Sequence, residues 1–94
     1  MTLRRFLIER DIPKAGTMDR EQLRAASGQS NSVLRQLGPD IQWVQSYVTD
    51  DKIFCVYLAT SEGMIKKHAE MSGFPATKIT EIRKVIDPTT ERPE

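Results

Sequence analysis

The sequence predicts an α+β protein of the ferredoxin-like type, with the element order βαββαβ. Four segments alternate apolar and polar residues as strands do, two repeat apolar residues every three or four positions as helices do, and turn-forming or helix-capping residues separate them. Right-handed connections then place two helices on one face of a four-stranded antiparallel sheet. The 94 residues suffice for one domain, which we expect at 1–87, followed by a flexible tail at 88–94.

The first two elements are a strand and a long helix. Alternation predicts the strand at residues 4–10. The helix is expected to begin after Thr17, a residue type that caps helix N-termini, and to continue to Leu37. Gly38 and Pro39 then provide a stop signal, so the helix is expected to end there.

The centre of the chain predicts a β-hairpin. Residues 41–49 and 52–59 both alternate, and Asp50 with Asp51 makes a tight polar turn between them. These two segments are therefore expected to be the second and third strands.

The last two elements are a short helix and a strand. Ser61 can cap the helix, which is expected to end at Gly73 because Pro75 prevents its continuation. Alternation then predicts the fourth strand at residues 79–86.

The alternation also predicts which side chains face the helices. The more apolar set is expected to do so: Phe6, Ile8, Val44, Val48, Phe54, Val56, Leu58, Ile82 and Ile86. The opposite face is expected to carry Leu7, Glu9, Trp43, Gln45, Tyr47, Ile53, Cys55, Tyr57, Glu81 and Val85. That face is too aromatic to be left in water, which favours docking on a second copy. The expected assembly is a homodimer through the sheet face, a dimeric α+β barrel.

Composition excludes several classes of protein. Lys and Arg number 14 against 13 Asp and Glu, so no basic surface for nucleic acid is expected. The longest apolar run is seven residues, against the roughly 20 of a membrane helix. A single cysteine cannot form an internal disulfide, and the N-terminus shows no apolar signal region. A cytoplasmic protein that binds neither membrane nor nucleic acid is expected.

His68 and Cys55 are the first candidates for chemistry. His68, the only histidine, fits a metal ligand or an acid–base group, or else a cation that the end of its helix favours. Cys55 fits a buried structural thiol, and a nucleophilic Cys–His pair is the less favoured interpretation.

A second group of candidates lies on the strands. Glu9 and Glu81, with Tyr47 and Tyr57, are expected to share a face and could hold a cation or a polar ligand. The alternative is a network of salt bridges, in which Arg10, Arg83 or an arginine of a partner chain neutralises the acids. Trp43 could stack on a flat ligand or pack in a dimer interface.

Strand alternation separates these candidates into two sites. It places Glu9 and Tyr57 away from the helices, whereas His68 lies on a helix. The strand residues and His68 therefore belong to separate sites unless a bulge shifts the alternation.

Five segments resemble a known family. They are residues 6–10, 42–57, 65–69, 73–76 and 85–89. The family consists of short bacterial proteins catalogued as a domain of unknown function, and its best-described type is a nickel-binding protein of actinobacteria. The resemblance implies a ferredoxin-like homodimer and nickel binding. His68 with Glu9 suits nickel in kind, because nickel accepts imidazole and carboxylate ligands.

Three functions follow as hypotheses. The first is a small dimeric nickel-binding protein, acting as a store, chaperone or sensor. The alternative is a dimeric-barrel enzyme without a cofactor, or a binder of a small organic ligand, with no organic cofactor expected in either case. The third is an interaction module that docks another chain. Candidate ligand-binding residues are Glu9, Trp43, Tyr47, Cys55, Tyr57 and Glu81, and the candidate metal ligands are His68 and Glu9.

Overall fold

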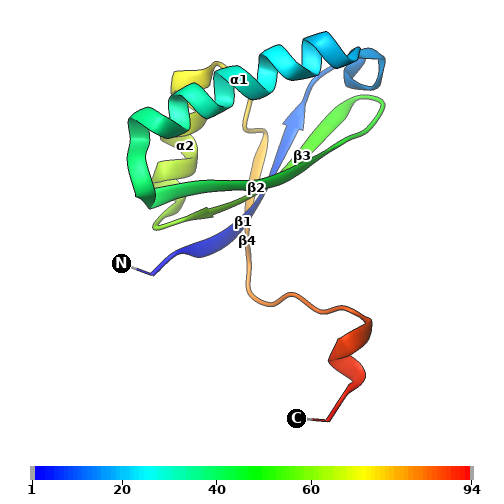
Figure 1. Cartoon of the computed structure of the whole chain (residues 1–94), viewed down its shortest axis with the longest axis vertical. Helices are drawn as coiled ribbons and strands as arrows, with labels where there is room; N and C mark the ends of the chain where they lie inside the picture. Colours follow the sequence, from blue (N-terminus) through cyan, green and yellow to red (C-terminus); the bar gives the residue numbers. More distant parts are fainter. Residues whose placement is uncertain (1, 94) are drawn as a thin grey trace.

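The computed structural model describes residues 2–93 and shows a four-stranded antiparallel sheet with two helices on one side (Figure 1). The strands are β1 (Arg4–Asp11), β2 (Ile41–Val48), β3 (Lys52–Ala59) and β4 (Lys78–Ile82), in the order β2-β3-β1-β4. The helices are α1 (Arg20–Leu37) and α2 (Glu62–Ser72), with short 3-10 helices at Ala15–Thr17, Gly38–Asp40 and Pro88–Glu91. The predicted ferredoxin-like fold is confirmed.

Local capping explains where the helices begin and end. The Asp19 carboxylate accepts from the backbone N–H of Gln22, and the Gln22 side chain accepts from the backbone N–H of Asp19. This reciprocal capping box satisfies two otherwise free N–H groups, so α1 begins after Asp19 and the predicted cap at Thr17 is wrong. Ser61 caps α2 as predicted, and Gly73 ends it with a left-handed φ of 79°.

The fourth strand is shorter than predicted. Its last pair is Arg5 with Ile82, close to the point where β1 itself begins. With little of β1 left to pair, the chain leaves the sheet and projects away from it (Figure 1). Ile86, which we expected to meet the helices, is 77% exposed. The domain boundary at residue 87 stays a prediction.

The predicted faces are right for β1 and inverted for β3. Phe6 and Ile8 face the helices, and their paired residues in β3 are Tyr57 and Cys55. Directly paired residues share a face of the sheet, so Tyr57 and Cys55 face the helices as well. The sequence pattern misled because the polar phenol of Tyr57 is buried together with hydrogen-bonding partners. Three residues predicted to face the helices face away instead: Phe54, Val56 and Leu58.

A bulge in β2 explains two more errors. The pairing shifts between Trp43, which pairs with Tyr57, and Gln45, which pairs with Val56. Trp43 therefore lies on the helix side, contrary to the prediction. Val44 is the extra residue and is 47% exposed instead of packed under the helices.

The β4 assignments are inverted too. Glu81 pairs with Phe6 and so lies toward the helix side, whereas Ile82 pairs with Arg5 on the other side. The residues of this strand alternate as predicted, but each faces the side opposite to the one that we expected.

The core lies between the helices and the sheet. Its buried residues are Phe6, Ile8, Ile41, Cys55, Tyr57, Ala59 and Ile65. Within residues 2–93, no helix combines the length and the apolar character that crossing a membrane requires.

Candidate functional site

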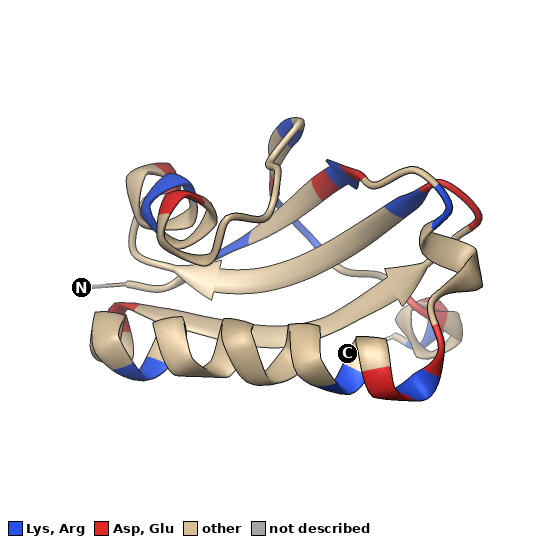
Figure 2. Ribbon diagram, turned by 90° about the horizontal axis from the view of Figure 1, so that it is seen from above, with Lys and Arg blue, Asp and Glu red and all other residues tan. Residues whose placement is uncertain are grey.

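A cavity of about 470 Å³ lies on the helix side of the sheet, under α1. Its lining is mostly apolar, with a few polar groups among the side chains. Arg10, Ala26, Ser30, Trp43, Tyr57 and Phe74 are among the residues that line it. The middle of α1 carries no charged residue, as Figure 2 shows. The side chains of Ala26, Ser27 and Ser30 in this stretch are small and leave room for the cavity.

Arg10 brings a buried positive charge to this cavity. It is 3% exposed, its Nε donates to Cys55 Sγ at 3.4 Å and its Nη1 donates to the Pro75 carbonyl at 2.8 Å. Its Nη2 has no hydrogen-bond partner. Among residues 2–93 no carboxylate forms an ion pair with Arg10. A buried charge without a counter-charge is costly, so this guanidinium needs an explanation.

Aromatic rings hold the guanidinium in place. Its Cζ lies 6.0 Å from the ring centroid of Tyr57 and 5.8 Å from that of Phe74. Cation–π attraction offsets part of the burial cost but does not neutralise the charge. Sequence reasoning considered Arg10 only as a neutraliser of acids. The available signal was its inward position in β1, two residues after Ile8.

A chain of hydrogen bonds runs from α2 to the cavity. The Nε2 of His68 lies 3.0 Å from Ser30 Oγ, and Ser30 Oγ lies 3.3 Å from the Tyr57 hydroxyl. The ring centroids of Tyr57 and His68 are 5.1 Å apart. Ser30 and Tyr57 line the cavity, and His68 lies behind them. Sequence reasoning missed Ser30, which only the packing of α1 against α2 and β3 brings into place.

The protonation of this chain follows from burial. Desolvation lowers the pKa of His68 to about 4, and the nearby Arg10 charge contributes to the same shift, so the imidazole is neutral at neutral pH. Burial also raises the pKa of the Tyr57 phenol, which stays protonated. The Nδ1 of His68 is buried without a partner. In the tautomer that carries its hydrogen on Nε2, this N–H donates to Ser30 and Nδ1 is an acceptor. The unpartnered Nδ1 then leaves only a lone pair without a hydrogen bond, and no buried N–H group lacks an acceptor.

The structure brings together some predicted site residues and separates others. Trp43, Cys55, Tyr57 and His68 all lie on the helix side, which removes the conflict between Tyr57 and His68. Tyr47 pairs with Phe54 on the opposite side and is 51% exposed.

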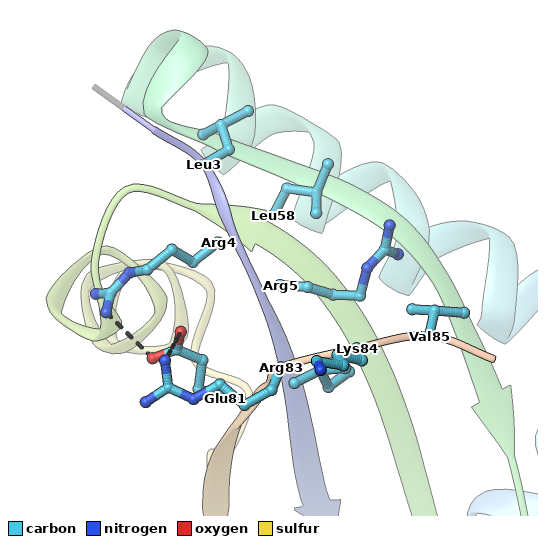
Figure 3. A pocket seen from close by; sticks show the side chains of 9 residues that line it. Leu3, Arg4, Arg5, Leu58, Glu81, Arg83, Lys84 and Val85 are labelled. Carbon is cyan, nitrogen blue, oxygen red and sulfur yellow. Dashed lines mark hydrogen bonds and ion pairs between the residues drawn. The ribbon is translucent and has the colours of Figure 1, made fainter. Parts of the chain in front are cut away.

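The two candidate acids form ion pairs at the surface. Glu9 lies on the side away from the helices, with its Oε1 3.5 Å from Lys52 Nζ. Glu81 contacts Arg4 at 3.1 Å and Arg83 at 3.4 Å, at the rim of a separate basic pocket (Figure 3). The expectation that Glu9 and Glu81 share a face is wrong, and the salt-bridge alternative describes both.

The expected metal ligands do not assemble within one subunit. His68 and Glu9 lie on opposite sides of the sheet, because Glu9 alternates with the inward Ile8 and Arg10. In the described part of the chain, no group of three or more His, Cys, Asp or Glu side chains is placed to hold a metal ion. The donor set of one subunit therefore does not fit nickel.

Fold and cavity together define a small ferredoxin-like protein with a ligand-sized space between a helix and the sheet. Residues 6–82 match the model of the SCO4226-like family, described as nickel responsive proteins, so the chain belongs to that family. The crystal structure of SCO4226 from Streptomyces coelicolor A3(2) is similar, with a TM-score of 0.74 and 17% identity over 87% of this chain and 99% of that one. A search of curated proteins finds no match.

Proposed function

We propose that the protein is a ligand-binding member of this family, and that it binds a small organic molecule in the cavity under α1. The observation that carries the proposal is the buried guanidinium of Arg10, whose Nη2 has no partner. A cavity of about 470 Å³ has the size of known ligand pockets, which are mostly apolar with a few placed polar groups.

The side chains around the cavity suit a ligand with a flat or apolar body. Trp43 offers an indole face, and it lies roughly parallel to the Tyr57 ring with centroids 6.5 Å apart. His68 is not among the residues that line the cavity and acts as a positioning residue for Ser30 and Tyr57. This is a binding function, and the proposal includes no catalytic step.

A cavity-filling variant tests the proposal. We expect small aromatic compounds to shift amide NMR signals of cavity residues, and Ala26→Phe to weaken their binding about tenfold or more by occupying the space. The matched control is Gln36→Phe, which adds the same side chain at an exposed position of α1. Compounds that shift only surface signals, or bind Ala26→Phe unchanged, would contradict the proposal.

Nickel binding by a homodimer is the second candidate, favoured by the family description. The side of the sheet away from the helices, the outer face, carries half-buried apolar residues that no helix or strand within residues 2–93 covers: Leu7, Phe54, Val56, Leu58 and Ile82. Pairing two outer faces would bury them. It would also bring two copies of Glu9 into one interface, where carboxylate and water oxygens suit divalent nickel.

Native mass spectrometry of the untagged protein tests this second candidate. A dimer that takes up nickel in a fixed ratio and loses it in Glu9→Gln is the expected result. His68→Asn should keep the ion, because a dication beside His68 would be repelled by Arg10. A dimer that takes up no nickel would contradict the metal site and leave the proposed interface standing.

We also propose a cytoplasmic location, with which the single cysteine, Cys55, is consistent.

A further inference from the structure

We infer that the cavity selects an organic anion, and specifically a carboxylate attached to an apolar body. The inference rests on the proposed function, because it names the ligand class of the same cavity. Three features of the cavity carry it: an uncompensated cation, a second hydrogen-bond donor, and an apolar wall.

The uncompensated cation is Arg10. Its Nε donates to Cys55 and its Nη1 to Pro75, whereas Nη2 is buried and its N–H groups have no acceptor. A guanidinium matches the planar geometry of a carboxylate and binds it with charge-assisted hydrogen bonds. A monoanion would therefore supply both the missing counter-charge and the missing acceptor.

The second donor is the Tyr57 hydroxyl. When His68 Nε2–H donates to Ser30, the Ser30 hydroxyl is left to donate to Tyr57, and the Tyr57 O–H is left to donate into the cavity that it lines. A carboxylate has enough lone pairs to accept from both Arg10 and Tyr57. The buried hydrogen-bond chain thus sets the direction in which Tyr57 donates.

The apolar wall restricts the rest of the ligand. Leu23, Ile53, Trp43 and Phe74 line the same space. A small, strongly hydrated anion such as inorganic phosphate would leave this surface without contacts, and a cation would be repelled by Arg10. The cavity therefore fits an amphipathic acid, with the carboxylate toward Arg10 and the body against the indole of Trp43.

Trp43 gives the test a direct signal, because it is the only tryptophan of the chain and lines the cavity. The probes are 3-phenylpropionate and its uncharged counterpart 3-phenyl-1-propanol, titrated while Trp43 fluorescence is recorded. For the native protein we expect saturable binding of the acid and about tenfold or more weaker binding of the alcohol.

The Arg10→Met variant should remove this preference. It keeps much of the length and the apolar stem of the side chain but loses the charge, so acid binding should fall about tenfold or more while alcohol binding changes less than about threefold. The matched control is Arg35→Met, which removes the same charge from an exposed position of α1 and should bind both probes like the native protein.

The outcomes separate the two claims. If acid and alcohol bind equally and Arg10→Met changes neither, the anion inference is overturned and the cavity remains a binding site for neutral compounds. If neither probe perturbs Trp43 or the amide signals of the cavity, the proposed function fails as well. If Arg10→Met does not fold, Tyr57→Phe replaces it: it removes the hydroxyl that donates to the ligand and accepts from Ser30, and unchanged acid binding there overturns the inference.

Discussion

The two sides of the sheet use charge in opposite ways. On the outer face, Lys52 Nζ lies 3.5 Å from Glu9 Oε1, and both side chains are partly exposed. On the helix side, Arg10 is almost fully buried and no carboxylate of residues 2–93 pairs with it. Pairing the exposed charges and leaving the buried one alone is unfavourable for stability. The carboxylates of residues 2–93 therefore do not account for the buried charge of Arg10, which is the charge that the proposed ligand would neutralise.

The greatest loss of stability is expected in a comparison of two phenylalanines on opposite sides of the sheet. Phe6 is 1% exposed in the core, so Phe6→Ala should lower the free energy of unfolding by about 3–5 kcal/mol. Phe54 is only half-buried on the outer face, and Phe54→Ala should cost about 1 kcal/mol in the monomer while shifting any dimer toward monomer. Urea unfolding at one protein concentration and sedimentation measure the two effects. Equal losses would show that the outer face is as deeply packed as the core.

The next effect is the pH dependence that His68 confers. Its pKa is about 4 in the folded protein, against 6.5 for an unperturbed histidine, so the unfolded chain binds more protons between these values. Stability is full above pH 6.5 and falls as the pH drops toward 4, by about 2 kcal/mol at pH 5 relative to pH 7.

His68→Asn is the control for this pH effect. It removes the titrating group while keeping a polar side chain near Ser30, so unfolding curves at pH 7 and pH 5 should differ by less than in the native protein. An equally steep profile in the variant would assign the pH dependence to other groups and contradict the burial of a neutral His68.

Arg10 separates stability from binding. Arg10→Met removes a buried charge without a counter-charge but also leaves the Pro75 carbonyl without its donor. These effects oppose each other, so the free energy of unfolding without ligand should change by no more than about 1 kcal/mol. Affinity for the carboxylate probe should fall far more, because the charge that binds it is gone. A loss of stability as large as that of Phe6→Ala would make Arg10 a structural residue and remove the contrast between the two faces.

The sequence predicts the fold because its signals are local. Gly38 with Pro39, Ser61 and Gly73 act on their own helix ends, and the hairpin follows from alternation on both sides of Asp50 and Asp51. Where two local signals compete, as Thr17 and Asp19 do for the start of α1, only the structure shows that the reciprocal bonds of Asp19 and Gln22 prevail.

The site is harder to predict because it depends on register. Two features decide which side of the sheet each aromatic residue faces: the bulge after Trp43 and the pairing of Phe6 with Tyr57. The alternation of apolar and polar residues in the sequence indicates neither of them. Apolar character also misleads at β3, where the strand is apolar on both sides. A buried polar residue such as Tyr57 is explained only by partners that are distant in sequence, Ser30 and His68.

The smallest expected effect concerns the ion pairs of the outer face. Lys52 Nζ lies 3.5 Å from Glu9 and 3.6 Å from Asp11, with 45% of its side chain exposed. In the monomer, Lys52→Met should therefore cost only about 0.5 kcal/mol, because water and salt screen exposed pairs. The variant Lys66→Met, which removes an exposed pair with Glu62 at 3.2 Å on α2, is the matched control.

Unfolding of both variants is measured at low and at high protein concentration. If two outer faces pair in a dimer, the desolvated Glu9 makes Lys52→Met more costly at high concentration while Lys66→Met stays unchanged. Equal small losses at both concentrations would show that this face remains in water, and would contradict the homodimer on which the nickel candidate depends.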